Sequence, residues 1–299
     1  MPPPGPRSRA LAAYRAQPHR PPSCAGGVYP EDPVALARAL DRWLELPAPR
    51  WPDEPPRLVV VPHVDFTRGA RVYAPAARAL AGADADLYVV FGTAHVTPPH
   101  LFTLTRLDYA TPLGSIPTDR ALVDELVRRL GEDEVLGDED VHAEEHAIEL
   151  PLLALLRANR RPARILPVLC SSISQLKDPA RATLAFLDAL GRELRGRNVC
   201  YVAGADLAHA GPMYGDARPL DPVERTELAA LDRRTLAALE EGDPEAFFRE
   251  AVRQDDRRRL CGVAPIYAAM KASGLGAKVL GYAQWTDGQD LVSFAAAAG

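Results

Sequence analysis

Three histidines each follow an apolar run of strand length. His63 follows LVVVP, His95 follows LYVVFGTA, and His209 follows NVCYVAGA with Asp206 three residues before it. Imidazole is the commonest transition-metal ligand in proteins and the usual acid or base near neutral pH. One histidine after a strand is more often a structural loop residue. Three strands that deliver histidine to one sheet edge favour a metal or acid–base site.

A second histidine pair lies in the segment His142-Ala-Glu-Glu-His146. It satisfies the H-x-x-E-H pattern of inverted zinc peptidases, in which two histidines one helical turn apart bind zinc and Glu is the base. The segment follows the acidic stretch GDEDV, so we expect His142 to precede the helix that contains His146. In that arrangement the required spacing is absent, and zinc hydrolysis is the weaker hypothesis.

Cys261 precedes the apolar stretch that begins at Ile266, which predicts a helix over 266–272. A thiol at a helix N-terminus has a lowered pKa, and a thiolate is both a nucleophile and a metal ligand. The alternative is a small buried side chain that fills space. From these residues alone, the space-filling interpretation is favoured.

Alternating strands and helices must position these side chains. Continuous Val/Ile/Leu runs without polar alternation indicate strands covered on both faces, and hence a largely parallel sheet between helical layers. We expect strands at Leu58–Val61, Leu87–Phe91, Arg164–Leu169, Val199–Ala203, Val279–Trp285 and Leu291–Ala296. Helices are expected over 33–46, 118–130 and 144–157 and after Asp178, Asp221 and Asp243. Asp287-Gly288 predicts a hairpin between the last two strands. The pattern predicts a three-layer α/β architecture.

The composition narrows the class of protein. Hydrophobic residues make up 47% of the 299, and the net charge of -5 argues against a nucleic-acid binder. No run of about 18 apolar residues predicts a membrane span. The four cysteines have no metal-knuckle or redox-pair spacing, and no secretory leader is apparent, so we expect a cytoplasmic protein. We expect residues 1–20 to be a loosely ordered, Pro-rich arm and 21–299 to be one domain.

Seven motifs appear in one order from residue 61 onward: VPHVDFTRG, VVFGTAH, EEHAIELPL, ILPVL, ADLAHAG, CGVAPI and LGYAQWTDG. This combination resembles the MEMO family, including the bacterial AmmeMemoRadiSam system protein B. The similarity covers the chain from about residue 21 to its end. No single motif is specific, but chance agreement of seven in register is improbable.

The resemblance implies a fold like the catalytic subunit of class III extradiol dioxygenases, an α/β/α sandwich with a mostly parallel, mixed sheet. It assigns the metal ligands to His63, His95 and Cys261, and Fe(II) is the expected ion, with Cu or Zn as alternatives. It assigns further site roles to Asp206 and His209 and to the pair Glu145–His146. We therefore expect His209, His146 and Asp206 to be the catalytic residues.

Some residues depart from the family pattern. GPSHH is replaced by a segment that keeps only His95, the HAGxxY pattern begins with Cys24, and PHAGY becomes PHVDF with Asp65 and Phe66. The resemblance implies a non-haem metal-dependent oxidoreductase that acts on a small molecule. The alternative is a non-catalytic module that binds a metal or a peptide. AMMECR-type or radical SAM proteins are the implied functional partners.

Overall fold

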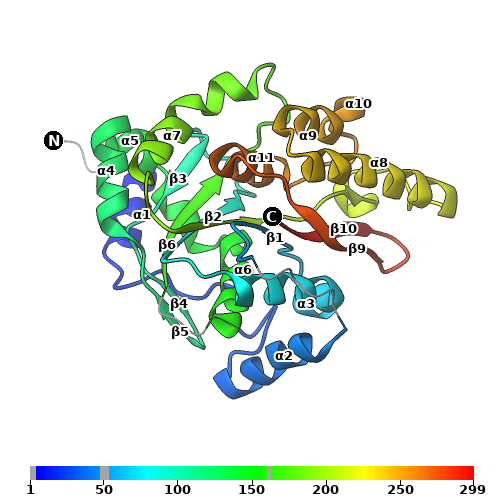
Figure 1. Cartoon of the computed structure of the whole chain (residues 1–299), viewed down its shortest axis with the longest axis horizontal. Helices are drawn as coiled ribbons and strands as arrows, with labels where there is room; N and C mark the ends of the chain where they lie inside the picture. Colours follow the sequence, from blue (N-terminus) through cyan, green and yellow to red (C-terminus); the bar gives the residue numbers. More distant parts are fainter. Residues whose placement is uncertain (1–4, 48–53, 160–162) are drawn as a thin grey trace.

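The computed structural model describes residues 5–47, 54–159 and 163–299, and their central element is a mixed sheet (Figure 1). The strand order is β3-β6-β2-β7-β1-β10-β8, and β9 pairs with β10 outside this path. The strands are β1 (Leu58–Val61), β2 (Leu87–Thr93), β3 (Phe102–Leu104), β6 (Arg164–Cys170), β7 (Val199–Gly204), β8 (His209–Ala210), β9 (Lys278–Thr286) and β10 (Leu291–Ala298). Strands β6, β2, β7 and β1 are parallel, whereas β3, β8, β9 and β10 pair in antiparallel fashion. The predicted mostly parallel sheet is confirmed.

Helices cover both faces of this sheet, as the continuous apolar strands require. In β2, Leu87, Val89 and Phe91 lie in one hydrophobic cluster, and the alternate residues Tyr88 and Val90 lie in the other. The first cluster contains residues of α4 (Arg120–Leu130), α5 (Glu132–Leu136), α7 (Pro179–Glu193), α8 (Pro222–Glu241), α9 (Pro244–Ala251) and α11 (Val263–Ser273). The second contains residues of α2 (Pro33–Glu45), α3 (Phe66–Gly82) and α6 (His146–Ala158). The result is a three-layer α/β/α sandwich (Figure 1).

Local caps explain where the helices begin. Asp32 accepts a hydrogen bond of 2.7 Å from the backbone N–H of Ala35, and Pro33 occupies the first helical position. Asp221 and Glu224 form a capping box at the start of α8. These two helix starts confirm the prediction from the sequence. Part of the predicted extended connection over 47–57, residues 48–53, lies outside the described residues.

The N-terminal segment differs from its prediction. From Gly5 onward the expected loose arm contains α1 (Pro6–Arg15), which packs on the short helix η1 (Glu139–Ala143). Tyr14 is buried, and its hydroxyl lies 3.1 Å from the Thr105 Oγ1 atom. Burial of an aromatic side chain and its hydroxyl contact hold the helix in place despite the flanking prolines. The division into an arm and one domain from residue 21 stays a prediction.

Smaller elements complete the fold. A hairpin of β4 (Tyr109–Thr111) and β5 (Gly114–Ile116), the short helix η2 (Pro212–Tyr214) and the single turn α10 (Arg253–Asp256) connect the larger ones. No helix among the described residues is long and apolar enough to cross a membrane.

Candidate metal centre

Three neighbouring parallel strands end at the same edge of the sheet. Strands β1 and β2 both pair with β7, so their carboxyl ends lie side by side. His63 comes two residues after β1, His95 two residues after β2, and Asp206 two residues after β7. In open α/β sheets this edge is the usual position of a ligand crevice.

The start of α6 closes over the strand ends. Gly92 in β2 and Gly204 in β7 face the first turn of this helix, and both positions are too close to it for a side chain. A Cβ atom on Gly92 would lie 2.6 Å from the Ile148 Cγ1 atom, and one on Gly204 would overlap the carbonyl oxygen of Ala147. These two glycines let the helix approach, and that approach brings His146 to the same edge as the strand-end residues.

His63, His95 and His146 form a cluster in which one potential ligand atom from each residue lies within 4.8 Å of the others. The ring centroids of His63 lie 5.1 Å from His95 and 5.2 Å from His146, and the ring planes are close to perpendicular. The rings of His95 and His146 are stacked at 4.7 Å with an interplanar angle of 11°. The sequence had grouped His63 and His95 with His209 instead.

Two of the three Nδ1 atoms in the cluster have a hydrogen-bond acceptor from the protein. The His63 Nδ1 atom lies 3.0 Å from the carbonyl oxygen of Gly204, which can only accept. The His95 Nδ1 atom lies 3.0 Å from the Glu145 Oε1 atom, whereas the His146 Nδ1 atom lies 3.2 Å from the same oxygen without hydrogen-bond geometry. The acceptors of His63 and His95 place the proton on Nδ1 and leave the Nε2 lone pair unprotonated.

Glu145 organises this wall of the site. It is the N-cap of α6, where its carboxylate accepts the backbone N–H groups of His146 at 2.8 Å and Ala147 at 3.0 Å. It also accepts the backbone N–H of His95 at 2.8 Å. Burial alone would raise the pKa of Glu145. The hydrogen bond and charge of His95 and the charge of His146 outweigh this effect of burial and lower the pKa to about 2. The carboxylate is therefore ionised at neutral pH.

Cys261 approaches His63 from the opposite layer. Its Sγ atom lies 3.3 Å from the His63 Nε2 atom. The Thr93 hydroxyl donates to the Cys261 carbonyl at 2.9 Å, and the backbone N–H of Gly262 donates to the Asp206 carbonyl at 3.0 Å. A Cβ atom at position 262 would overlap that carbonyl, so glycine allows this approach. Burial raises the pKa of the Cys261 thiol well above its usual value. The sequence-based expectation of a lowered pKa at a helix N-terminus is therefore wrong for the free thiol.

Asp206 lies directly behind His63. Its Oδ1 atom accepts the backbone N–H of His63 at 3.0 Å, and its Oδ2 atom lies 3.7 Å from the His63 Nε2 atom. Burial raises the pKa of Asp206 to about 7, although hydrogen bonds from the backbone of His63 and Val64 oppose the shift. A buried carboxyl beside an imidazole can orient it and exchange a proton near neutral pH.

His209 lies outside the three-histidine cluster. Its Nδ1 atom is 3.1 Å from the Leu207 carbonyl oxygen and 3.2 Å from that of Arg259, and its ring contacts Tyr214 at 5.0 Å between centroids. Burial lowers the pKa of His209 to about 4. The chain continues past Asp206 into β8, and this short strand takes His209 away from the strand-end position.

His142 has a structural role. It lies in η1, before α6, as expected, and its side chain is fully buried. Its Nδ1 atom is 2.6 Å from the Tyr109 hydroxyl, and its Nε2 atom is 2.9 Å from the Thr103 carbonyl oxygen. Because protein groups occupy both ring nitrogens, His142 and His146 do not form the zinc pair of an inverted peptidase.

Comparison with known proteins identifies the family of this chain. The model of the Memo-like protein family matches residues 20–298. The chain belongs to the Memo-like protein family. A MEMO1 family protein of Methanopyrus kandleri is 30% identical over 85% of this chain and 88% of its own length. One from Methanosarcina acetivorans is 29% identical over 90% of this chain and 92% of its own. A third, from Aquifex aeolicus, is 26% identical over 82% of this chain, and the match spans 61% of that protein.

Proposed function

We propose that the cluster of histidines with Cys261 beside it is a mononuclear transition-metal centre of an oxidoreductase that acts on a small molecule, with Fe(II) as its metal. The observation that supports it most is the proximity of His63, His95 and His146. One potential ligand atom of each ring lies within 4.8 Å of the others, and protein acceptors at Nδ1 orient the rings of His63 and His95. Ligating histidines in metalloproteins are oriented in this way by a carboxylate or a backbone carbonyl.

The ring orientations favour His63, His95 and Cys261 as the ligands. An Nε2 lone pair lies in its ring plane, so two stacked rings cannot direct their lone pairs to one point. The stacking of His95 on His146 therefore lets one of them join His63, whose ring is nearly perpendicular to both. Thr93 links the strand end before His95 to the Cys261 backbone, which favours His95 as that ligand.

This donor set fits a transition-metal ion. Two neutral imidazoles and a thiolate suit Fe(II), Cu or Zn better than Mg²⁺ or Ca²⁺, which prefer oxygen ligands. A bound Fe(II) would supply one-electron redox chemistry with an open coordination position for a substrate. Loading would have to displace the thiol proton, since burial keeps the free Cys261 protonated at neutral pH.

The remaining side chains define what the protein itself contributes. His146 presents a free Nε2 next to His95 and is the proposed acid or base nearest the centre. Asp206 orients the backbone of His63, and its pKa of about 7 lets it hold or release a proton there. His209 is the proposed second acid or base, positioned by the carbonyls of Leu207 and Arg259.

Metal analysis tests the centre. Protein reconstituted anaerobically with Fe(II) and desalted should retain about one iron per chain, and His63→Ala and Cys261→Ser should both lose it. His146→Ala should keep the iron and lose activity. The exposed His19 offers a matched control, because His19→Ala removes a histidine outside the cluster. Equal iron in His63→Ala, Cys261→Ser and the control would refute the assignment.

Oxygen uptake separates an enzyme from a binding module. The iron-loaded protein is mixed with a panel of catechols and related small phenols, and oxygen consumption is followed with the unloaded protein as a blank. The proposal predicts substrate-dependent uptake that His146→Ala lowers by about 10²-fold or more. Retained iron without uptake across the panel would support the alternative, a non-catalytic module that binds a metal or a peptide.

A further inference from the structure

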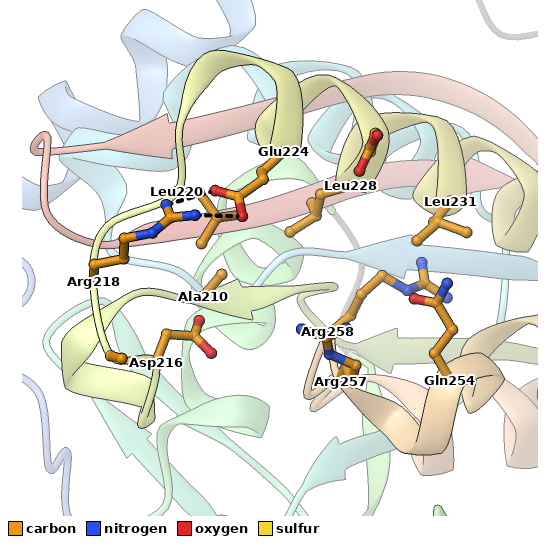
Figure 2. A pocket seen from close by; sticks show the side chains of 12 residues that line it. Ala210, Asp216, Arg218, Leu220, Glu224, Leu228, Leu231, Gln254, Arg257 and Arg258 are labelled. Atoms are coloured by element: carbon orange, nitrogen blue, oxygen red, sulfur yellow. Dashed lines mark hydrogen bonds and ion pairs between the residues drawn. The ribbon is translucent and has the colours of Figure 1, made fainter.

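A cavity of about 340 Å³ lies beside β8, apart from the proposed ligands. Helix α8, the loop after β8 and the segment 254–258 form its walls. Figure 2 shows Gln254, Arg257 and Arg258 on one side, Asp216 and Arg218 on the other, and Leu228 and Leu231 on α8 above them. The volume is that of a site for a small organic molecule.

Most charges of the lining are already paired. Arg218 makes two contacts of 2.9 Å with the Glu224 carboxylate (Figure 2). Asp216 pairs with Arg259 at 2.7 Å. In the part of the chain that the structure describes, Arg257 and Glu227 are the lining charges for which no ion pair is found.

Hydrogen-bond donors predominate on the side of the cavity that Arg257 occupies. Arg258 is buried, and its Nη1 atom donates to Asp232 at 2.7 Å and its Nη2 atom to the Glu250 carbonyl at 2.6 Å. Its Nε atom has no acceptor among the described residues. A buried N–H without an acceptor costs about 1–3 kcal/mol. Gln254 and Arg257 line the same side of the cavity (Figure 2), so an acceptor that enters here meets a guanidinium and an amide.

The backbone of this side adopts costly conformations. Gln254 and Asp256 have φ angles of 60° and 55°, in the left-handed region that non-glycine residues rarely adopt. Each such residue costs about 1 kcal/mol or more, and strain of this kind concentrates at ligand sites. The conformation holds Gln254, Arg257 and Arg258 on one wall.

The opposite surface combines apolar side chains with charged ones. Leu220, Leu228 and Leu231 line the cavity together with Ala210 and Ala217, beside the ion pair of Arg218 and Glu224. An occupant that contacts both Arg257 and the leucines would combine an anionic head with an aliphatic body. We propose that this cavity binds a small aliphatic monocarboxylate, whose carboxylate contacts Arg257 and Gln254 while its chain covers the leucines. None of the proposed metal ligands lines this cavity.

Calorimetric titration of the full chain with 4-methylpentanoate tests the proposal. The wild-type protein should show saturable binding at one site, and the neutral 4-methylpentanamide should bind at least about tenfold more weakly. Arg257→Gln should weaken carboxylate binding by about tenfold or more. Arg253→Gln is the matched control, because Arg253 pairs with Glu250 outside the cavity lining, and it should bind within about twofold of wild type.

Glu227→Gln tests the sign of the charge. Removal of this carboxylate should leave carboxylate binding unchanged or tighter, because a like charge is lost. Arg257 and Glu227 are surface positions, so the variants should fold, and their circular dichroism spectra check this. Three results would overturn the proposal: no saturable binding by the wild type, equal affinities for the acid and the amide, or an undiminished affinity in Arg257→Gln.

Discussion

Substitution of Glu149 by Gln should destabilise the protein far more than loss of a surface carboxylate. Glu149 and Arg20 form an ion pair in which both side chains are 0% exposed. The Glu149 carboxylate also accepts the Ser23 backbone N–H and hydroxyl, both at 2.9 Å, the Cys24 N–H at 3.1 Å and the Tyr29 hydroxyl. These bonds attach the segment 20–29 to α6. The amide would leave the buried Arg20 charge without a counterion.

The expected loss is about 3–5 kcal/mol, the cost of breaking a buried pair by removal of one partner. Domains have total stabilities of about 5–15 kcal/mol, so this is about a fifth or more of the total. Urea unfolding followed by circular dichroism should show a midpoint lower by about 1 M or more. Arg20→Met combined with Glu149→Leu should recover part of the loss, because no buried charge then remains.

Glu132→Gln is the control for this comparison. Glu132 pairs with Arg15 at 3.2 Å and is 56% exposed, so its loss should cost about 0–1 kcal/mol. If Glu149→Gln unfolds within about 1 kcal/mol of Glu132→Gln, the buried pair does not hold the N-terminal segment and the reasoning is wrong.

Three further predictions concern the site and its surroundings. Gly262→Ala should lower the free energy of unfolding by about 1–3 kcal/mol and weaken iron retention, because the added methyl group overlaps the Asp206 carbonyl and displaces Cys261. Its control is Gly191→Ala, in open space on α7, which should raise the free energy of unfolding by about 0.5–1 kcal/mol. Burial lowers the pKa of His142 from 6.5 to about 3, so the unfolded chain binds a proton at a higher pH than the folded protein does. The free energy of unfolding, measured with urea, should therefore fall by about 2–3 kcal/mol from pH 7 to pH 4.5, and by less in His142→Gln. The pKa of Glu145 is lowered from 4.5 to about 2. Its contribution of about 2–3 kcal/mol to the free energy of unfolding is therefore present above pH 4.5 and disappears as the pH falls toward 2. Glu145→Gln should lack this pH dependence. A pH profile of stability that either variant leaves unchanged would contradict the corresponding prediction.

The fold could be predicted to a large extent from local patterns. The continuous apolar strands and the Asp-Pro helix starts depend on residues close in sequence, and both were recognised. Strands β3, β4, β5 and β8 have only two or three residues each, too few for an apolar pattern, and pairing partners far along the chain define β3 and β8. Helix α1 was missed for a similar reason, because it is held by contacts of Tyr14 and Arg15 with residues more than 90 positions away.

The candidate site was predictable where it depends on strand topology. His63 and His95 follow adjacent parallel strands, and their shared edge follows from the fold. His146 lies in the cluster because α6 approaches Gly92 and Gly204 closely. No local sequence pattern predicts this approach. Glu145 before an apolar helix was the available signal. For Cys261 the residues alone favoured a space-filling role, and its distance from His63 shows the contact that they could not.

The carboxylate of Glu145 caps α6, accepts from His95 and lies 3.2 Å from the His146 Nδ1 atom, and for the proposed metal centre this has a consequence for how the protein matures. A site whose ligands are positioned by such contacts forms when the chain folds, so the proposal implies that apo-protein accumulates as a native species and captures its metal afterwards. Structural zinc domains behave oppositely, since they fold only with their ion. The metal found in purified protein would then report the supply in the producing cell, and growth medium becomes an experimental variable.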